Sequence, residues 1–261
     1  MAKISATINI CNEAYLLRDC LKSLSGFADE IVVCDMMSSD GGQDIAREFG
    51  CIVFSHPRMP YGEYTIVPRI QRATGDWILL FDPDMRLPEK TAERLREIVK
   101  NNEADVVQFF LRNKVFGKYI FHGHGSAGYY TKFFKKEVFL KNGIPDIRIH
   151  RMVNDTLRKA TDRWIKLDRE YFLEHLAYDN VFRCFQRHLQ YAKIEADERY
   201  TRGERFCFKN MLLEVVRKIL VDFIYRSAWR DGMPAIIYSL ISELMIFQTH
   251  LFLWEYDQRK K

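Results

Sequence analysis

The sequence predicts an α/β protein in which a mixed, mainly parallel β-sheet is flanked by helices and followed by a helical C-terminal extension. Three observations lead to this prediction. Strand-like apolar segments alternate with amphipathic helical segments in the N-terminal half. The uninterrupted apolar run over residues 77–81 is typical of a strand that is buried on both faces. After Asp179 the strand-like patterns end, and only helical periodicity remains.

The first part of the chain is expected to form a β-α-β-α-β unit. Alternating residues over 4–10 predict a strand, and apolar residues at helical spacing predict a helix that ends at Gly26. A second strand is expected over 30–35, a second helix over 40–48 and a third strand over 51–54. This alternation predicts parallel strands that are joined by right-handed crossovers.

The middle of the chain predicts a mixture of elements. A short helix is expected over 65–73, and Pro68 is expected to confine it to its later half. The buried strand over 77–81 should stop at Pro83, and Pro88 is expected to begin an amphipathic helix. The remaining strand-like segments are residues 106–111, 119–121, 129–134 and 167–173. Gly123, Gly125 and Gly128 predict a conformationally permissive loop before the third of these segments.

Composition limits the classes of protein that fit. The 261 residues suffice for one large domain with an appendage, and a hydrophobic content of 48% argues against global disorder. The net charge is +5, and residues 181–261 contribute +4 of it, with fourteen Lys/Arg against ten Asp/Glu. This basic segment suits an anionic surface.

The six cysteines include no Cys-x-x-Cys pair, so zinc is not predicted and reduced thiols in a cytoplasmic protein are expected. No signal peptide is recognisable at the N-terminus.

The C-terminal extension predicts three helical segments over 180–201, 206–229 and 235–256. The second combines apolar residues at helical spacing with interspersed Arg and Lys, which suits a membrane surface. The third is more apolar, but Glu243 and His250 interrupt it, so it is not a clean membrane span. The alternative is that these helices pack against the rest of the chain or against a second subunit. We therefore expect a domain over 1–179 and a helical extension over 180–261.

Four carboxylates are expected to meet at one edge of the sheet. Glu13 follows the first strand, Asp35 ends the second, and Asp82 and Asp84 follow the buried strand. The carboxyl ends of strands in such sheets are where ligands bind. Asp82 and Asp84 would repel each other unless a cation lay between them, and a hard divalent cation holding diphosphate oxygens would satisfy both. The alternative is a polar turn after a strand.

These motifs, in this order, resemble the family-2 glycosyltransferases of the GT-A fold. The resemblance covers about residues 3–190, and its nearest subgroup is the lipopolysaccharide-core β-glucosyltransferase type. It implies a nucleotide-sugar donor, with a UDP-sugar favoured, and Mg²⁺ or Mn²⁺ as the cofactor. It also implies a glycan or lipid-linked acceptor in cell-envelope biosynthesis. The segments that carry the resemblance are Asn12-Glu13, Glu30–Asp35 with Ser38-Ser39-Asp40, and Ala73–Trp77 leading to Asp82-Pro83-Asp84.

The resemblance implies roles for the nucleotide-binding residues. Asn12 and Glu13 would line the nucleotide pocket, and Asp35 would accept a hydrogen bond from the base, typically uracil N3–H. Asp82 would contact the ribose. For Asp35 and for Asp40, the alternative is a role in the turn or in capping the next helix.

The resemblance also implies a metal and acceptor region. Asp84, with Asp82, would hold the metal ion that binds the diphosphate, and His175 lies where many GT-A enzymes carry a late histidine near this group. The glycine-containing loop resembles an acceptor loop, so His124 would contact the acceptor or the diphosphate. The alternative for each of these histidines is a structural role.

The sequence departs from the family pattern at two places. Ile66 and Val67 stand where a basic residue and an asparagine are usual, and Arg151 stands where the subgroup often has a glutamate. An inverting transfer needs a carboxylate to accept the proton of the acceptor hydroxyl. Asp155 is the first candidate and Asp146 the second, whereas Arg151 would instead grip the diphosphate. A surface-charge role is the alternative for all three.

Two classes of function therefore remain open. The first is an inverting, metal-assisted hexosyltransferase located in the cytoplasm, associated with the inner face of the membrane or forming a homodimer. The second is a non-catalytic nucleotide- or carbohydrate-binding protein with a degenerate site. A nucleotidyltransferase would require a glycine-rich, basic loop after the first strand, and residues 11–14 do not provide one. No nucleic-acid partner is expected.

Overall fold

The structure is a computed structural model that describes residues 2–126, 128–143 and 152–259, and the chain divides into two compact units. The first unit comprises Met1–Leu111 and Gly128–His175, and the second comprises Arg112–Ala127 and Leu176–Lys261. The segment 112–127 therefore groups with the C-terminal helices. The functional division after residue 179 stays a prediction.

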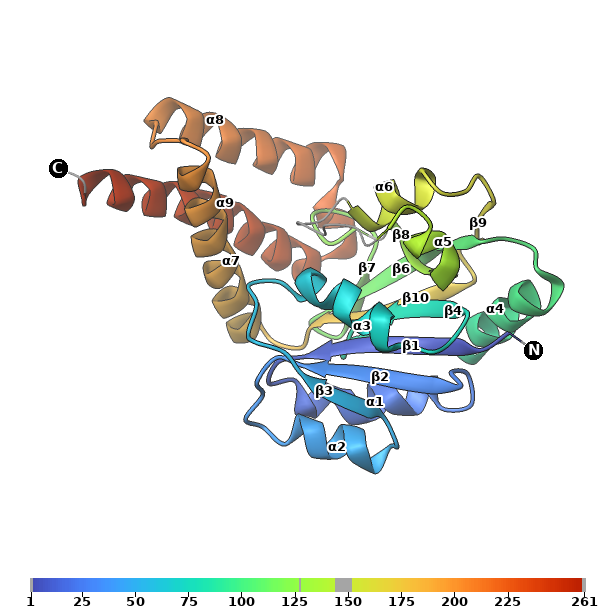
Figure 1. The fold of residues 1–261 in the computed structure, drawn as a ribbon. Helices are drawn as coiled ribbons and strands as arrows, with labels where there is room; N and C mark the ends of the chain where they lie inside the picture. Colours follow the sequence, from blue (N-terminus) through green and yellow to red (C-terminus); the bar gives the residue numbers. More distant parts are fainter. Residues whose placement is uncertain (1, 127, 144–151, 260–261) are drawn as a thin grey trace. The chain divides into compact units, whose positions relative to one another are not determined.

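The first unit is built on a mixed, mainly parallel sheet, as the sequence predicts (Figure 1). The parallel strands are β1 (Ile4–Ile10), β2 (Glu30–Asp35), β3 (Ile52–Ser55) and β4 (Trp77–Phe81). The other strands of the sheet are β5 (Met85–Arg86), β6 (Val106–Val115), β7 (Lys118–Ile120), β8 (Gly128–Lys135), β9 (Trp164–Lys166) and β10 (Phe172–Tyr178). Of these, β7 lies in the segment 112–127, which belongs to the second unit. The strand order is β3-β2-β1-β4-β8-β6-β10-β5, and both β7 and β9 pair with β6.

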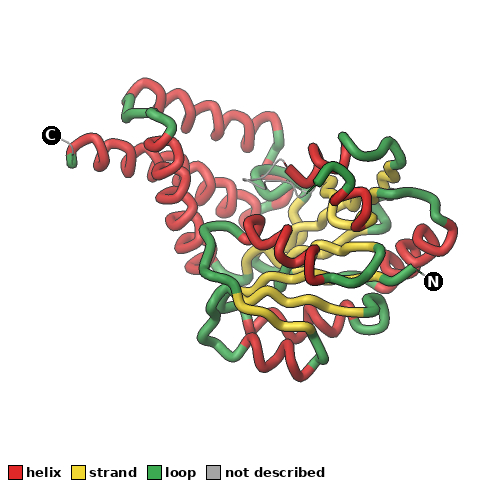
Figure 2. The backbone as a smooth tube through the Cα atoms, in the orientation of Figure 1, coloured by secondary structure: helices red, strands yellow, loops and turns green. Residues whose placement is uncertain are grey.

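Helices cover both faces of this sheet, and the strands appear between them in Figure 2. Helices α1 (Ala14–Leu24), α2 (Gly42–Glu48) and α4 (Glu89–Asn101) pack on one face. Helices α3 (Ile66–Arg72), α5 (Lys136–Leu140) and α6 (Met152–Arg158) pack on the other. A short 3₁₀ turn, η1 (Gly62–Thr65), precedes α3.

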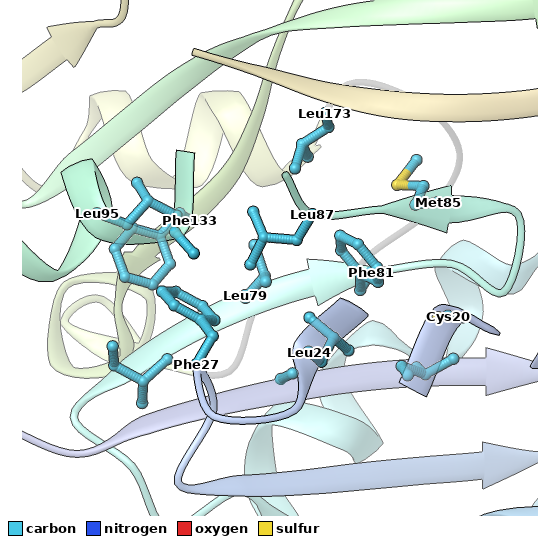
Figure 3. Close-up of a cluster of buried hydrophobic side chains, with 14 of the residues drawn as sticks. Cys20, Leu24, Phe27, Leu79, Phe81, Met85, Leu87, Leu95, Phe133 and Leu173 are labelled. Atoms are coloured by element: carbon cyan, nitrogen blue, oxygen red, sulfur yellow. The ribbon is translucent and has the colours of Figure 1, made fainter. Parts of the chain in front are cut away.

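Strand β4 is buried on both faces, which confirms the prediction from its continuous apolar run. Trp77, Leu79 and Phe81 point to the α1 side, and Ile78 and Leu80 to the α3 side. Figure 3 shows the α1 side, where Leu79 and Phe81 lie among side chains from α1, α4, β8 and β10. Burial of each such side chain contributes about 1.5–3 kcal/mol, so this strand anchors the acidic residues that follow it.

Two expected elements differ in their bounds. Helix α3 begins at Ile66, before Pro68, because the first turn of a helix does not need the N–H group that proline lacks. The strand expected over 167–173 is wrong in position. Leu167 leaves β9, a turn with a hydrogen bond from Tyr171 N to the Asp168 carbonyl follows, and β10 begins only at Phe172.

The second unit contains α7 (Val181–Thr201), α8 (Phe208–Ile219) and α9 (Met233–Gln258), and α9 packs against both α7 and α8. The helix expected over 206–229 does not continue unbroken. A π-helical segment, η2 (Leu220–Tyr225), follows α8, and a 3₁₀ turn, η3 (Ala228–Asp231), comes next. The break lies at Ser227, whose φ of 52° is left-handed and therefore incompatible with a continuing helix.

Helix α9 is the segment among the described residues that is long and apolar enough to cross a membrane, with 26 residues and a mean hydropathy of 1.5. The core helix of a soluble protein passes the same test, and 39% of the apolar stretch is buried inside the structure. This finding is weak evidence for a membrane span.

Candidate active site

The sheet brings the predicted acidic residues to one edge. In the parallel register, Ile10 of β1 lies beside Asp35 of β2, and Ile8 of β1 lies beside Phe81 of β4. The segments that follow these three strands therefore leave the sheet at the same edge. They carry Asn12 and Glu13, the Asp35 turn, and Asp82 with Asp84.

Asp35 is fully buried and holds the turn after β2. Its carboxylate accepts hydrogen bonds from the backbone N–H of Ser38, at 3.1 Å from Oδ1, and from the side-chain amide of Gln43. Asp40 accepts from the backbone N–H groups of Ala14 at 2.7 Å and Gly42 at 3.1 Å. Asp40 therefore acts as a turn residue that joins the starts of α1 and α2. The expected capping of α2 by Asp40 is not observed, because the N-cap of α2 is Gly41 and no side-chain capping bond is formed there. Contact between Asp35 and a base stays a prediction.

The junction after β1 interlocks with the turn after β2. Asn12 adopts a left-handed conformation with φ of 57°, which asparagine tolerates better than most residues. Its side-chain oxygen accepts from Ser39 N at 2.8 Å, and its own N–H donates to Ser38 Oγ at 3.0 Å. The Glu13 carbonyl accepts hydrogen bonds from the backbone N–H groups of Leu16 and Leu17 in α1. The two segments expected to line a nucleotide pocket are therefore fixed to each other.

Asp82 is held as an anion by two cations that the sequence analysis did not identify. Lys132 of β8 places its Nζ 2.7 Å from Asp82 Oδ2, and Arg69 of α3 lies buried nearby and donates to the Thr7 carbonyl at 2.9 Å. Burial alone would raise the pKa of Asp82, but Lys132 and then Arg69 outweigh it and lower that pKa to about 2. The contact between Lys132 and Asp82 depends on the pairing of β8 with β4, and no local sequence motif predicts that pairing.

Asp84 has one partnered and one unpartnered oxygen. Its Oδ2 lies 3.3 Å from Nε2 of His175, because β5 and β10 pair with Met85 opposite His175. Its Oδ1 is buried and has no hydrogen-bond partner in the described part of the chain. A buried carboxylate oxygen without a donor is costly unless a further group satisfies it. The structure thus brings together Asp82, Asp84 and His175, as the sequence analysis expected.

A divalent cation fits this arrangement. Mg²⁺ and Mn²⁺ favour carboxylate oxygens, and such sites usually combine one or two protein ligands with substrate phosphates and water. Within the described residues, no group of three or more His, Cys, Asp or Glu side chains forms a complete ligand set. The expected metal ligands Asp84, Asp82 and His175 stay a prediction. The observation that favours them is the buried Oδ1 of Asp84, which has no hydrogen-bond partner among the described residues.

The candidates for the proton acceptor are the least defined. Asp146 and Arg151 lie outside the described residues. Asp155 is exposed on α6, two residues before the buried Leu157 that packs in the core of the first unit. The catalytic role of Asp155 therefore stays a prediction.

His124 has its described contacts in the second unit. Its backbone N–H donates to Ser239 Oγ at 3.2 Å, and its Nδ1 lies 3.0 Å from Nζ of Lys218. Burial, followed by the charge of Lys218, lowers the pKa of His124 to about 4, so the ring is neutral at pH 7. Its expected role in acceptor or diphosphate binding stays a prediction.

The glycines beside His124 serve close packing. A Cβ atom at Gly125 would lie 2.7 Å from the Tyr238 ring, and one at Gly123 would lie 2.7 Å from Ala228 Cβ. The interpretation of this loop as merely permissive is therefore incomplete, because a side chain at either position would collide with the second unit's own helices.

Comparison with known proteins assigns the family. Residues 5–160 match the sequence profile of Glycosyl transferase family 2. The chain therefore belongs to this family, and the match covers the described sheet edge except for His175. An uncharacterized glycosyltransferase of Rickettsia felis is 30% identical over 106 residues, which are 40% of this chain and 37% of that protein. The chain thus matches only about a third of that relative's length.

Solved structures support the GT-A-like fold. A mannosyltransferase from Pyrobaculum calidifontis, solved with GDP-Man and Mn²⁺, covers 97% of this chain and 88% of its own, with 13% identity and a TM-score of 0.54. S. aureus TarS covers 95% of this chain and 55% of its own, with 14% identity and a TM-score of 0.53. At these identities the similarity concerns the fold.

Proposed function

We propose that the protein transfers a sugar from a nucleotide-diphosphate donor to an acceptor hydroxyl, with the assistance of Mg²⁺ or Mn²⁺. The observation that carries this proposal is the buried Oδ1 of Asp84, which has no hydrogen-bond partner among the described residues and lies beside Asp82 and His175 at the carboxyl edge of the sheet. Membership of Glycosyl transferase family 2 supports the reaction class. The Mn²⁺ and GDP-Man in the mannosyltransferase structure agree with it.

Each residue of the edge has a task in this proposal. Asp84 and His175 would hold the cation, which when bound neutralises charge on the leaving nucleoside diphosphate. Lys132 and Arg69 keep Asp82 ionised, so that it accepts hydrogen bonds from the ribose or shares the cation. Asn12 and Glu13 form the rim of the nucleotide pocket.

The donor is proposed to be a UDP-sugar. Asp35 is an acceptor suited to the N3–H of uracil, and its turn is held in place by Ser38 and Gln43. A guanine base also presents N–H donors. A donor panel must therefore include GDP-mannose beside the UDP-sugars.

The transfer is proposed to invert the anomeric centre, with Asp155 as the base, Asp146 as the second candidate, and Arg151 against the diphosphate. Replacement of the base should lower the transfer rate by orders of magnitude and leave donor affinity near that of the wild type. Parallel assays of Asp155→Asn and Asp146→Asn rank the two candidates. If neither variant is impaired in an active enzyme, the base lies elsewhere in the chain.

The acceptor is proposed to be a glycan or a lipid-linked glycan of the cell envelope, as in lipopolysaccharide-core synthesis. The protein would act in the cytoplasm at the inner face of the membrane. The resemblance to the β-glucosyltransferase subgroup and the basic C-terminal segment support this location.

Hydrolysis of a panel of nucleotide sugars by the purified chain, with Mn²⁺ and with a chelator, tests the function. We expect one donor to be hydrolysed far faster than the others, and only in the presence of the metal. Metal-dependent binding of a nucleoside diphosphate without turnover of any donor or acceptor would favour the non-catalytic alternative. Turnover that is indifferent to the chelator would contradict the metal assignment.

A further inference from the structure

Helix α8 exposes a continuous row of large apolar side chains, which we call the apolar stripe. Each of its side chains is between 39% and 69% exposed, so none of them is covered by the rest of the described structure. They are Phe208, Leu212, Leu213, Val216 and Ile219 of α8, followed by Leu220 and Ile224 of the π-helical segment.

The apolar stripe occupies one side of the helix. At about 100° per residue, its five members within α8 fall inside an arc of about 140°. The opposite side packs within the second unit, where Met211 is buried and Glu214 bonds to Arg199 at 2.9 Å and to His250 at 2.8 Å. A surface helix normally turns its apolar side inward and its polar side to water. In α8 the polar Glu214 points inward, and the apolar stripe faces outward.

Positive charge accompanies the apolar stripe. Lys209 and Arg217 are exposed on α8, and Arg230 is exposed on the 3₁₀ turn beyond it. The carboxylates of the segment 206–233 are turned inward: Asp222 and Asp231 are buried, and Glu214 is engaged with Arg199. Trp229, 59% exposed, and Tyr225, 85% exposed, add aromatic side chains of the kind that settle at membrane interfaces.

We propose that the apolar stripe docks onto an anionic phospholipid surface, with α8 lying in the plane of the headgroups. Apolar side chains with Lys209 among them and Arg217 at their margin, and with no exposed carboxylate in residues 206–233, match the chemistry of such a surface. The long side chains of Lys209 and Arg217 can reach phosphate groups while their stems lie along the stripe. If the proposed function is right, the apolar stripe is the surface that would face a lipid-linked acceptor. Only this link to the acceptor rests on the proposed function; the docking of the stripe onto the lipid surface does not.

Charge argues against a second copy of the chain as the occupant. A twofold contact pairs a patch with itself, so Arg217 and Lys209 of both copies would be brought together. Within residues 206–233 no exposed carboxylate is available to compensate them. Lipid phosphates supply the missing negative charge.

Vesicle co-sedimentation of the purified full-length chain tests the proposal. We expect the wild type to bind vesicles of phosphatidylcholine with phosphatidylglycerol far more tightly than vesicles of phosphatidylcholine alone, and less tightly as salt is raised. Leu212→Ser with Ile224→Ser should weaken that binding about ten-fold or more, because two large side chains no longer enter the membrane. Arg217→Gln should reduce mainly the preference for phosphatidylglycerol.

The matched control is Ile52→Ser, which removes an apolar side chain that is 45% exposed on β3 of the other unit, close to the 52% of Leu212. It should bind vesicles like the wild type. Undiminished, salt-resistant binding of the stripe double variant would overturn the proposal and point to insertion of α9. A wild type that ignores both vesicles but dimerises, with the double variant monomeric, would overturn it in favour of a second copy. Nucleoside diphosphate affinity, measured on the same samples, tests the proposed function separately and should not change.

Discussion

Lys132 of β8 and Asp82, which follows β4, form an ion pair with 2.7 Å between Nζ and Oδ2. The pair crosses between two antiparallel strands at the edge where the acidic residues gather. The ion pair distinguishes the environments of Asp82 and Asp84. Asp82 has a cationic partner, whereas the buried Oδ1 of Asp84 has no hydrogen-bond partner in the part of the chain that the structure describes.

The first prediction concerns this pair. The pKa of Asp82 is lowered to about 2, so its ionised form stabilises the fold above the ordinary aspartate range, and that contribution is lost as the pH falls. Lys132→Gln should raise the pKa of Asp82 and move the acid loss of stability to higher pH. Urea unfolding of both proteins along a pH series measures the shift. The control is Lys100→Gln, because Lys100 is an exposed cation at the end of α4 and is not among the cations that lower the pKa of Asp82. If the unfolding free energies of Lys132→Gln and of the wild type fell in the same way at low pH, Lys132 would not be the group that lowers the pKa of Asp82.

A second prediction separates the two roles of Asp35. If its carboxylate binds the base, Asp35→Ala should weaken binding of uridine diphosphate by about ten- to a hundred-fold, the effect of losing one buried hydrogen bond. Gln43→Leu removes the hydrogen bond that Gln43 donates to the same carboxylate and leaves the carboxylate in place. It should retain most of the affinity. Calorimetric titration of uridine diphosphate into both variants measures the two affinities. An equal loss of affinity in both variants would mean that Asp35 only holds its turn in place and does not bind the base.

A third prediction concerns a buried acid in the second unit. Burial and the neighbouring Asp222 raise the pKa of Glu243 to about 7, while the Lys218 ammonium, 4.0 Å away, opposes the rise. His124 and Arg226 also face Asp222, at 3.9 Å and 3.1 Å. A raised pKa means that the protonated group stabilises the fold at low pH, and that this contribution is lost as the pH rises through 7.

Glu243→Gln should therefore remove part of the pH dependence. Between about pH 5 and about pH 9, the wild type should lose on the order of 1–3 kcal/mol of unfolding free energy relative to the variant. Glu255→Gln on the same helix is the control, because Glu255 pairs at the surface with Arg259. If the unfolding free energies of Glu243→Gln and of the wild type changed with pH in parallel, the pKa of Glu243 would not be raised.

The sequence predicted the parts of the site that follow from strand order. The apolar run of β4 and the acids after it needed only local pattern and the rule that parallel strands end together. The sequence analysis did not identify Lys132 and Arg69 as neighbours of Asp82. Their proximity depends on the register of β8 against β4 and on how α3 packs against the sheet, and no short sequence motif encodes either. The outward direction of the apolar stripe was equally hidden, since helical periodicity defines a face without saying what covers it.

One segment of the family pattern serves the fold at the opposite end of β4. Glu30 accepts hydrogen bonds from Ser5 Oγ at 2.5 Å, from Thr74 Oγ1 at 2.7 Å and from the Thr74 backbone N–H. Burial would raise the pKa of Glu30, but these bonds lower it to about 2. A Cβ atom at Gly75 would lie 2.8 Å from the Ser5 backbone nitrogen, so only glycine fits there. Thr74 and Gly75 thus help to identify the family because they lock β4 beside β1 and β2.

The metal-assisted nucleotide site at Asp84 is tested most directly by calorimetric titration of uridine diphosphate, with and without Mn²⁺, into the wild type and Asp84→Asn. We predict that Mn²⁺ tightens binding to the wild type, and that Asp84→Asn loses most of this gain while its thermal unfolding midpoint stays close to that of the wild type. Asparagine keeps the shape of the side chain but not the charge that a divalent cation requires. Equal tightening by Mn²⁺ in the two proteins would contradict the assignment of Asp84 as a metal ligand.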